Sequence, residues 1–131
     1  MANRHPRVRA VPTVGRKATR ERQSRNRIAA PQLRLRYPKL TSLQLGFVFS
    51  DTSAFLPSPQ MTVLHPPARA YFCFACPYGD CDGEFDLTDA IERMIGAREA
   101  RARGAVCCAG TRHGSDSCKL RLEYTLVACR G

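Results

Sequence analysis

The feature that most constrains this chain is the distribution of its cysteines. All seven lie in the second half of the sequence: Cys73, Cys76, Cys81, Cys107, Cys108, Cys118 and Cys129. Cys76 and Cys81 enclose the turn Pro-Tyr-Gly-Asp, and Gly83 follows Cys81 by two residues. Proline fixes φ after the first thiol, and we expect Gly79 and Gly83 to let the chain fold back so that its amides face the sulfurs. The sequence therefore predicts a tight turn that holds two thiols close together.

A second group of thiols lies further along the chain, at Cys107, Cys108 and Cys118. Cys108 is followed by Ala109 and Gly110, which repeats the thiol-x-Gly order of Cys81 and Gly83. Adjacent residues of a strand point to opposite faces, so this repeat favours Cys108 over Cys107 as the partner of the first turn. Two pairs of thiols are thus predicted to meet in one site.

Four converging thiols are typical of a structural zinc ion. Zn²⁺ is tetrahedral, binds thiolates at about 2.3 Å, and commonly draws two ligands from each of two turns. A unit of about 60 residues has a small core and commonly needs a metal or disulfides to be stable. The predicted zinc ligands are Cys76, Cys81, Cys108 and Cys118. Cys73, Cys107 and His113 stay open as substitutes for one of them, and burial as small core side chains is the alternative reading of the cysteines.

Hydrophobic periodicity predicts an α+β fold, a small ββαββ domain over residues 61–131. Strands are expected at 70–76, 84–87, 105–108 and 119–128, the last with regular alternation of apolar and polar residues. A helix is expected between the second and third strands, capped by Asp86 or Thr88 and running to about Arg103, with Gly104 as its stop.

Residues 1–60 differ from the rest of the chain in charge. They hold 12 Lys and Arg against 2 Asp and Glu, whereas residues 61–131 hold nine of each. The first 39 residues are rich in arginine and interrupted by proline, so we expect residues 1–60 to be a disordered basic leader. Our hypothesis is that translation begins at Met61; a basic arm for nucleic acid and an organelle transit peptide are the alternatives.

Together, these motifs resemble the zinc-ribbon class. More loosely, the Cys-Pro…Cys-x-Gly…Phe-Asp-Leu order of residues 76–87 is similar to that of small uncharacterised bacterial cysteine-rich proteins. The resemblance covers residues 71–124 and departs from a standard ribbon in its wide thiol spacings and in the helix between the hairpins. It implies a structural module that contacts protein or nucleic acid.

We therefore expect a non-enzymatic zinc-binding module with an unknown protein or nucleic-acid partner. The alternative is a thiol redox or metal-handling protein, based on Cys73-Phe-Ala-Cys76. That pair lies in a strand pattern, without the helix start that lowers a thiol pKa in redox sites. The acidic residues Asp80, Asp82, Glu84 and Asp86 are expected to form a solvated face.

No apolar run reaches the roughly 18–20 residues of a membrane helix, so no membrane association is expected. No secretory pattern is evident, and the cysteine count is odd. Both observations favour reduced thiols in a cytoplasmic protein. The sequence shows no motif for a small-molecule substrate.

Overall fold

The computed structural model describes residues 14–51, 59–113 and 116–131 and shows a mixed α+β fold with antiparallel strands. Its helices are α2 (Val14–Ala29), α3 (Leu33–Arg36) and α4 (Thr88–Gly96). Its strands are β1 (Leu40–Ser50), β2 (Gln60–Leu64), β3 (Cys73–Ala75), β4 (Glu84–Asp86), β5 (Arg101–Cys107), β6 (Thr111–Arg112), β7 (Asp116–Ser117) and β8 (Arg121–Arg130).

The largest element is a four-stranded antiparallel sheet in the order β2-β1-β8-β5. Its centre is the long pair of β1 and β8, which runs from Leu40 opposite Arg130 to Ser50 opposite Arg121. Alternate residues of both strands are buried, because an antiparallel sheet with one covered face places every second side chain in the core. The core side of β1 carries Leu43, Leu45 and Phe47.

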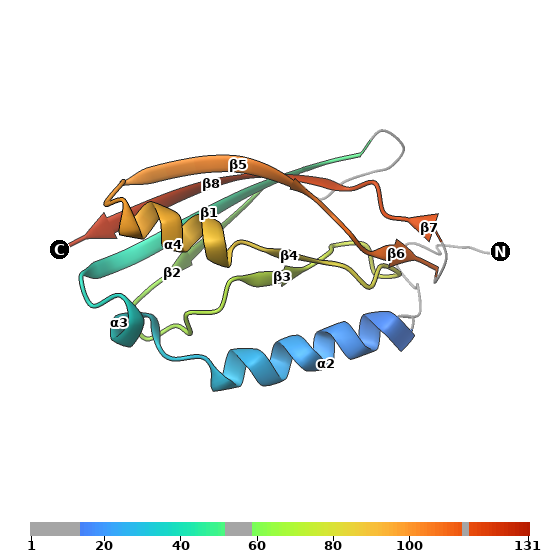
Figure 1. Ribbon diagram of the computed structural model, residues 1–131, viewed down its shortest axis with the longest axis horizontal. Helices are drawn as coiled ribbons and strands as arrows, with labels where there is room; N and C mark the ends of the chain where they lie inside the picture. Colours follow the sequence, from blue (N-terminus) through green and yellow to red (C-terminus); the bar gives the residue numbers. More distant parts are fainter. Residues whose placement is uncertain (1–13, 52–58, 114–115) are drawn as a thin grey trace.

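The covered face of the sheet packs against a middle layer of α4 and the β3–β4 hairpin, and α2 lies on the far side of that hairpin (Figure 1). Ile91 and Met94 are the fully buried side chains of α4. The hairpin packs its aromatic rings on the sheet: Phe74 contacts Phe47 at a centroid distance of 5.1 Å, edge to face. The core is thus shared between the sheet and this middle layer.

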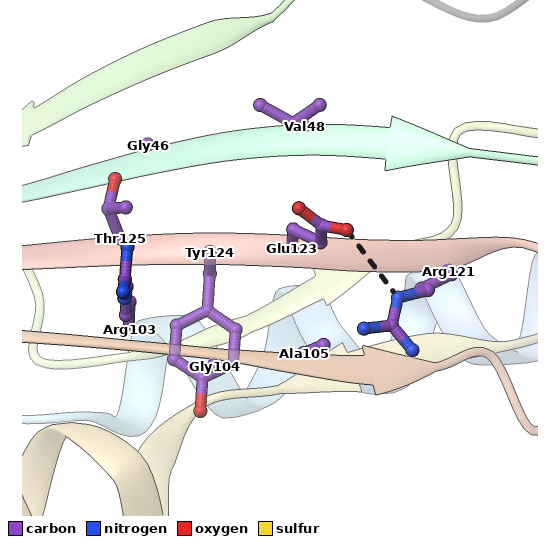
Figure 2. A pocket seen from close by; sticks show the side chains of 9 residues that line it. All are labelled: Gly46, Val48, Arg103, Gly104, Ala105, Arg121, Glu123, Tyr124 and Thr125. Carbon is purple, nitrogen blue, oxygen red and sulfur yellow. Dashed lines mark ion pairs between the residues drawn. The ribbon is translucent and has the colours of Figure 1, made fainter.

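The other face of the sheet has a hollow of about 560 Å³ over the middle of β1, β8 and β5 (Figure 2). Gly46 lines it on β1, opposite Thr125 of β8. Arg103 lines it together with Arg121, whose guanidinium lies 3.6 Å from the carboxylate of Glu123. These side chains form a polar surface of mixed charge.

Helix α4 is shorter than the sequence predicts. The prediction that it continues to Arg103 is wrong, because the helix ends at Gly96 and β5 begins at Arg101. The end is a Schellman motif: Arg98 has a φ of 57°, and the amide of Glu99 donates to the carbonyl of Met94. The following residues then alternate between exposed and half-buried positions, as a strand does.

The N-terminal half differs most from the prediction. Residues 14–50 were expected to be disordered, but they form α2, α3 and β1, and β1 is a central strand. The boundary at Met61 also falls inside a strand, since Met61 pairs with Gly46. The predicted disorder of residues 1–13 and 52–58 concerns residues outside those described.

The predicted ββαββ order is found along the chain as β3, β4, α4, β5 and β8, but the zinc-ribbon topology is not confirmed. Strands β5 and β8 pair with each other inside the four-stranded sheet, whereas β3 and β4 form a separate two-stranded one. The short hairpin β6–β7 is inserted between β5 and β8. Within the described ranges, no helix is long and apolar enough to cross a membrane.

Candidate metal centre

The structure brings together the four cysteines named from the sequence, Cys76, Cys81, Cys108 and Cys118. Their sulfur atoms all lie within 4.8 Å of one another, and all four residues are buried. The Sγ atoms of Cys76 and Cys118 are 3.9 Å apart, and those of Cys81 and Cys108 are 3.6 Å apart. Each close pair therefore joins the first turn to the second.

These separations fit a tetrahedral thiolate site. Four sulfurs at about 2.3 Å from a central ion are about 3.8 Å from one another. A disulfide would require about 2.05 Å, and all four residues are free cysteines. Soft thiolate ligands in a tetrahedron suit zinc or iron rather than a hard cation. The residues present thus fit a metal ion of this class.

Backbone amides face the sulfurs. The amide of Gly83 donates to Sγ of Cys81 at 3.3 Å, and the amide of Gly110 donates to Sγ of Cys108 at 3.4 Å. The amides of Tyr78 and Leu120 likewise donate to the thiols of Cys76 and Cys118, where they oppose but do not reverse the rise in the pKa of these two thiols. Such donors stabilise thiolates, and the thiol-x-Gly repeat of the sequence is their local signal.

The four thiols cannot all ionise without a cation. The hydrogen bond from the Cys76 thiol lowers the pKa of Cys108 to about 5, and the same bond raises the pKa of Cys76. Burial raises the pKa of Cys81 to about 12, and burial also raises that of Cys118. The arrangement therefore favours the thiolate form at Cys108 and the neutral form at the other three thiols, whereas four thiolates would need a positive ion among them.

The two turns are joined by hydrogen bonds around Asp82. Its carboxylate accepts from the amide of Thr111 at 2.7 Å and from the Thr111 hydroxyl at 3.0 Å, and its own amide donates to the carbonyl of Thr111 at 3.2 Å. A β-bridge between Cys81 and Arg112 continues the contact. These contacts between the two turns place their thiols opposite each other without a metal ion.

A second contact between the turns is the ion pair of Asp80. Arg112 donates two bonds to the Asp80 carboxylate, at 2.9 and 3.1 Å, and Nε2 of His113 lies 2.6 Å from it. The Arg112 guanidinium also lies 4.0 Å from the ring centroid of Tyr78. Burial would raise the pKa of Asp80, but the bonds from Arg112 outweigh it, so this pKa lies below its usual value.

The expectation that Asp80, Asp82, Glu84 and Asp86 form a solvated face holds only for Asp86, which is exposed; Asp80 is buried and the other two are half-buried. Each accepts hydrogen bonds from the protein: Asp80 and Asp82 from the second turn, Glu84 from Arg22 and Gln23 of α2, and Asp86 from the amide of Thr88. The bond to Thr88 lies at the start of α4, but the prediction that Asp86 or Thr88 caps this helix is wrong, because Leu87 is its N-cap residue. The hydrogen-bond donors to the other three carboxylates lie in distant segments of the chain, so the local sequence does not indicate them.

Helix α2 is attached to the first turn by polar contacts that sequence reasoning missed. The Arg16 guanidinium donates to the carbonyls of Cys76 at 2.6 Å and Cys81 at 3.3 Å. The hydroxyl of Thr19 donates to the carbonyl of Asp82 at 2.7 Å. Thr19 and Gln23, one turn apart, are the buried residues of the helix. Threonine and glutamine are mostly exposed in proteins, so no sequence signal indicated that this face of the helix is buried.

The structure does not bring the three substitute ligands into the cluster. Cys73 is half-buried on β3, Cys107 is exposed at the end of β5, and His113 is held by Asp80. Burial raises the pKa of Cys73 to about 11, which opposes an activated Cys73–Cys76 redox pair. Among the described residues, the four buried cysteines form the one group with the geometry of a metal site.

Comparisons of the chain with protein-family models, with curated proteins and with solved structures find no match.

Proposed function

We propose that this protein is a non-enzymatic structural module that holds one Zn²⁺ through Cys76, Cys81, Cys108 and Cys118. The observation that carries the proposal is the match between the sulfur separations, 3.6 and 3.9 Å, and the edge of a zinc–thiolate tetrahedron. Four protein ligands in a buried site leave no position for water or substrate, which distinguishes a structural from a catalytic zinc site.

A zinc ion at this position would join the β3–β4 hairpin to the segment that links β5 to β8. The two turns contribute two ligands each, as in the zinc-ribbon class. Such an ion contributes directly to folding free energy, because the ligands are far apart in the unfolded chain. The module would then present a rigid surface to a protein or nucleic-acid partner, rather than perform chemistry.

Elemental analysis of the purified full-length chain tests the proposal. We expect about one zinc per chain, lost together with cooperative unfolding when a strong chelator is added. Cys76→Ser and Cys118→Ser should abolish stoichiometric zinc, whereas Cys129→Ser, outside the cluster on β8, serves as the matched control and should retain it. Iron in place of zinc, visible by its colour, would keep the site but change the metal. Loss of zinc from all three variants, or from none, would contradict the ligand set.

A second candidate function is thiol redox or metal handling. The observation in its favour is the 3.6 Å separation between Sγ of Cys108 and Sγ of Cys81, in a cluster whose hydrogen bonds lower the pKa of Cys108. A thiolate beside a thiol can form a disulfide when an oxidant accepts two electrons from the pair and the thiol releases its one proton. Protein that is purified without metal, and that reacts with one equivalent of an alkylating agent at pH 6, would support this alternative. Stoichiometric zinc resistant to alkylation would exclude it.

A further inference from the structure

Helix α2 carries an unusual concentration of positive charge. Its 16 residues include six Lys and Arg and a single acidic residue, Glu21, and its first turn has no acidic residue. Arg16 and Lys17 therefore lie at the end of the helix where the macrodipole disfavours cations. An isolated helix of this length and composition is marginal in water, so its stability comes from the domain to which it is attached.

Three of the six cations attach α2 to the domain. Arg16 donates to the carbonyls of Cys76 and Cys81, and Arg22 forms an ion pair with Glu84 at 2.6 Å. The guanidinium of Arg27 lies 5.2 Å from the ring centroid of Tyr71. These contacts are distributed from the first to the last turn of α2, so both ends of the helix are attached to the domain.

The other three cations, Lys17, Arg20 and Arg25, are exposed and form no ion pair with the described residues. At about 100° per residue, they span about 140° of the helix circumference and, over eight residues, about 12 Å of its length. The helix lies on the side of the molecule opposite the sheet (Figure 1). The exposed charge continues beyond it with Arg34 and Lys39.

We propose that the outward side of α2, defined by Lys17, Arg20 and Arg25, binds the phosphate backbone of double-stranded DNA. This inference deepens the proposed function by naming its partner, and it rests on that function because the zinc turns hold Arg16 and thereby the helix. A DNA strand carries one phosphate per about 3.4 Å of axis, so 12 Å of helix faces three to four phosphates. The roughly 12 Å major groove admits an α-helix, whereas that of duplex RNA is too narrow.

The composition of α2 argues against other anionic partners. A helix that binds a membrane surface needs a continuous apolar side, but the large exposed apolar residues of α2, Val14 and Ile28, lie at opposite ends. A protein interface is usually centred on aromatic anchors, and α2 has none. Repeated cations without apolar anchors are the pattern expected for phosphate contacts, which are electrostatic and independent of sequence.

The test is fluorescence anisotropy with a labelled 20-base-pair DNA duplex and the zinc-loaded full chain, over a range of salt concentrations. If all three cations contact phosphates, the triple variant Lys17→Gln, Arg20→Gln, Arg25→Gln should reduce the magnitude of the slope of log K against log salt by about 2.7. Its affinity at 0.1 M salt should fall at least about tenfold. The matched control removes the same charge from exposed positions of β5 and β8, with Arg101→Gln, Arg103→Gln, Arg121→Gln, and should bind within about threefold of the wild type. Figure 2 shows Arg103 and Arg121.

Zinc content and thermal melting are measured on every variant. Because the substituted side chains are exposed, the substitutions should change neither quantity. A zinc-loaded wild type that does not bind the duplex overturns this inference but does not contradict the proposed zinc site. A purified chain that contains no zinc contradicts the proposed function itself. Equal losses in the α2 and sheet variants would show a general charge effect and overturn the assignment to α2. Tighter binding to duplex RNA, or to vesicles of anionic lipid, than to DNA would also overturn it.

Discussion

Gly83 and Gly110 lie face to face where the two thiol-bearing turns meet. A Cβ atom built on Gly83 would collide with Sγ of Cys108 and come within 2.9 Å of the amide nitrogen of Gly110. A Cβ atom on Gly110 would collide with the backbone of Gly83 and lie 2.8 Å from the carboxylate of Asp82. The backbones therefore need hydrogen in place of a side chain, so that the sulfurs can approach within bonding distance of one ion.

Gly83→Ala should weaken both zinc binding and folding, because the obstructing atoms belong to the backbone and to a predicted ligand. We expect a loss of about 1–3 kcal/mol in the free energy of unfolding, typical of an overpacked position, and a weaker zinc affinity. Chemical denaturation and competition with a chelator of known affinity measure the two effects.

Gly79→Ala is the matched control from the same turn. Among the described residues, no atom beyond its chain neighbours lies within 4 Å of a Cβ built there, and the φ of Gly79 is outside the left-handed region, so alanine should be neutral or slightly stabilising. Equal damage from the two substitutions would show that the turn needs glycine flexibility rather than close approach.

Zinc affinity should depend steeply on pH. Cys108, with its pKa of about 5, is already ionised at pH 7, whereas Cys81, with a pKa of about 12, and the two thiols whose pKa values are also raised are protonated. Binding at pH 7 should thus release about three protons, so log K should rise by about three per pH unit above pH 5. Proton release into a weak buffer with an indicator measures this number. A value near zero would mean that the metal-free cluster does not hold its thiols protonated.

Asp80→Asn should destabilise the protein at pH 7.5 by about 1–3 kcal/mol, because it leaves the partly buried Arg112 without its carboxylate. The folded-state pKa of Asp80 is lowered, so its contribution is present above its unfolded pKa and is lost as the pH falls through the folded one. Asp116→Asn, an exposed position on the neighbouring β7, is the control and should change stability by less than about 0.5 kcal/mol. If the denaturation curves of the two variants overlay, the Asp80–Arg112 ion pair contributes nothing measurable to the free energy of unfolding.

Arg98→Gly should stabilise the protein by about 0.5–1 kcal/mol. Arg98 closes α4 with a φ of 57°, a conformation that costs a non-glycine residue energy and that glycine adopts freely. Ala97→Gly, one residue earlier at a φ of −82°, should instead destabilise it slightly. Thermal melting of both variants tests the pair, and a loss of stability in Arg98→Gly would indicate that the arginine side chain contributes more than its backbone costs.

A fragment of residues 61–131 should not unfold cooperatively, although it keeps all seven cysteines. It lacks β1, whose Leu43 and Leu45 are fully buried and which pairs with β8 along its whole length. A fragment of residues 14–131 retains the complete sheet and is the control. Denaturation followed by circular dichroism compares them, and a 61–131 fragment as stable as the control would restore the domain boundary at Met61.

The features that the sequence predicted well are those determined by neighbouring residues. The thiol-x-Gly repeat at Cys81 and Cys108 indicated amides that face sulfurs, because that geometry depends on two residues and their dihedral angles. The alternation of residues 119–128 indicated a half-buried strand for the same reason. The four cysteines that it named come together in the structure, and their zinc occupancy stays a prediction.

Two other local patterns predicted the wrong structure for part of the chain. The apolar stripe of α4 led to a helix that continues to Arg103, whereas Arg98 in the left-handed region ends it and β8 recruits residues 101–107 as a strand. Charge and proline content indicated disorder for the first half, yet strand pairing with β8 orders β1. In both cases a tertiary partner outweighed a weak local preference.

The sequence by itself therefore determined the two turns, their thiols and the elements adjacent to them. Only the tertiary structure decided which acidic side chain pairs with which cation, that α2 rests on the carbonyls of Cys76 and Cys81, and that β1 separates β2 from β8. The physical reason is separation along the chain: these contacts join residues about 13 to 90 positions apart. They form because buried polar groups and apolar strands need partners that no local pattern can name.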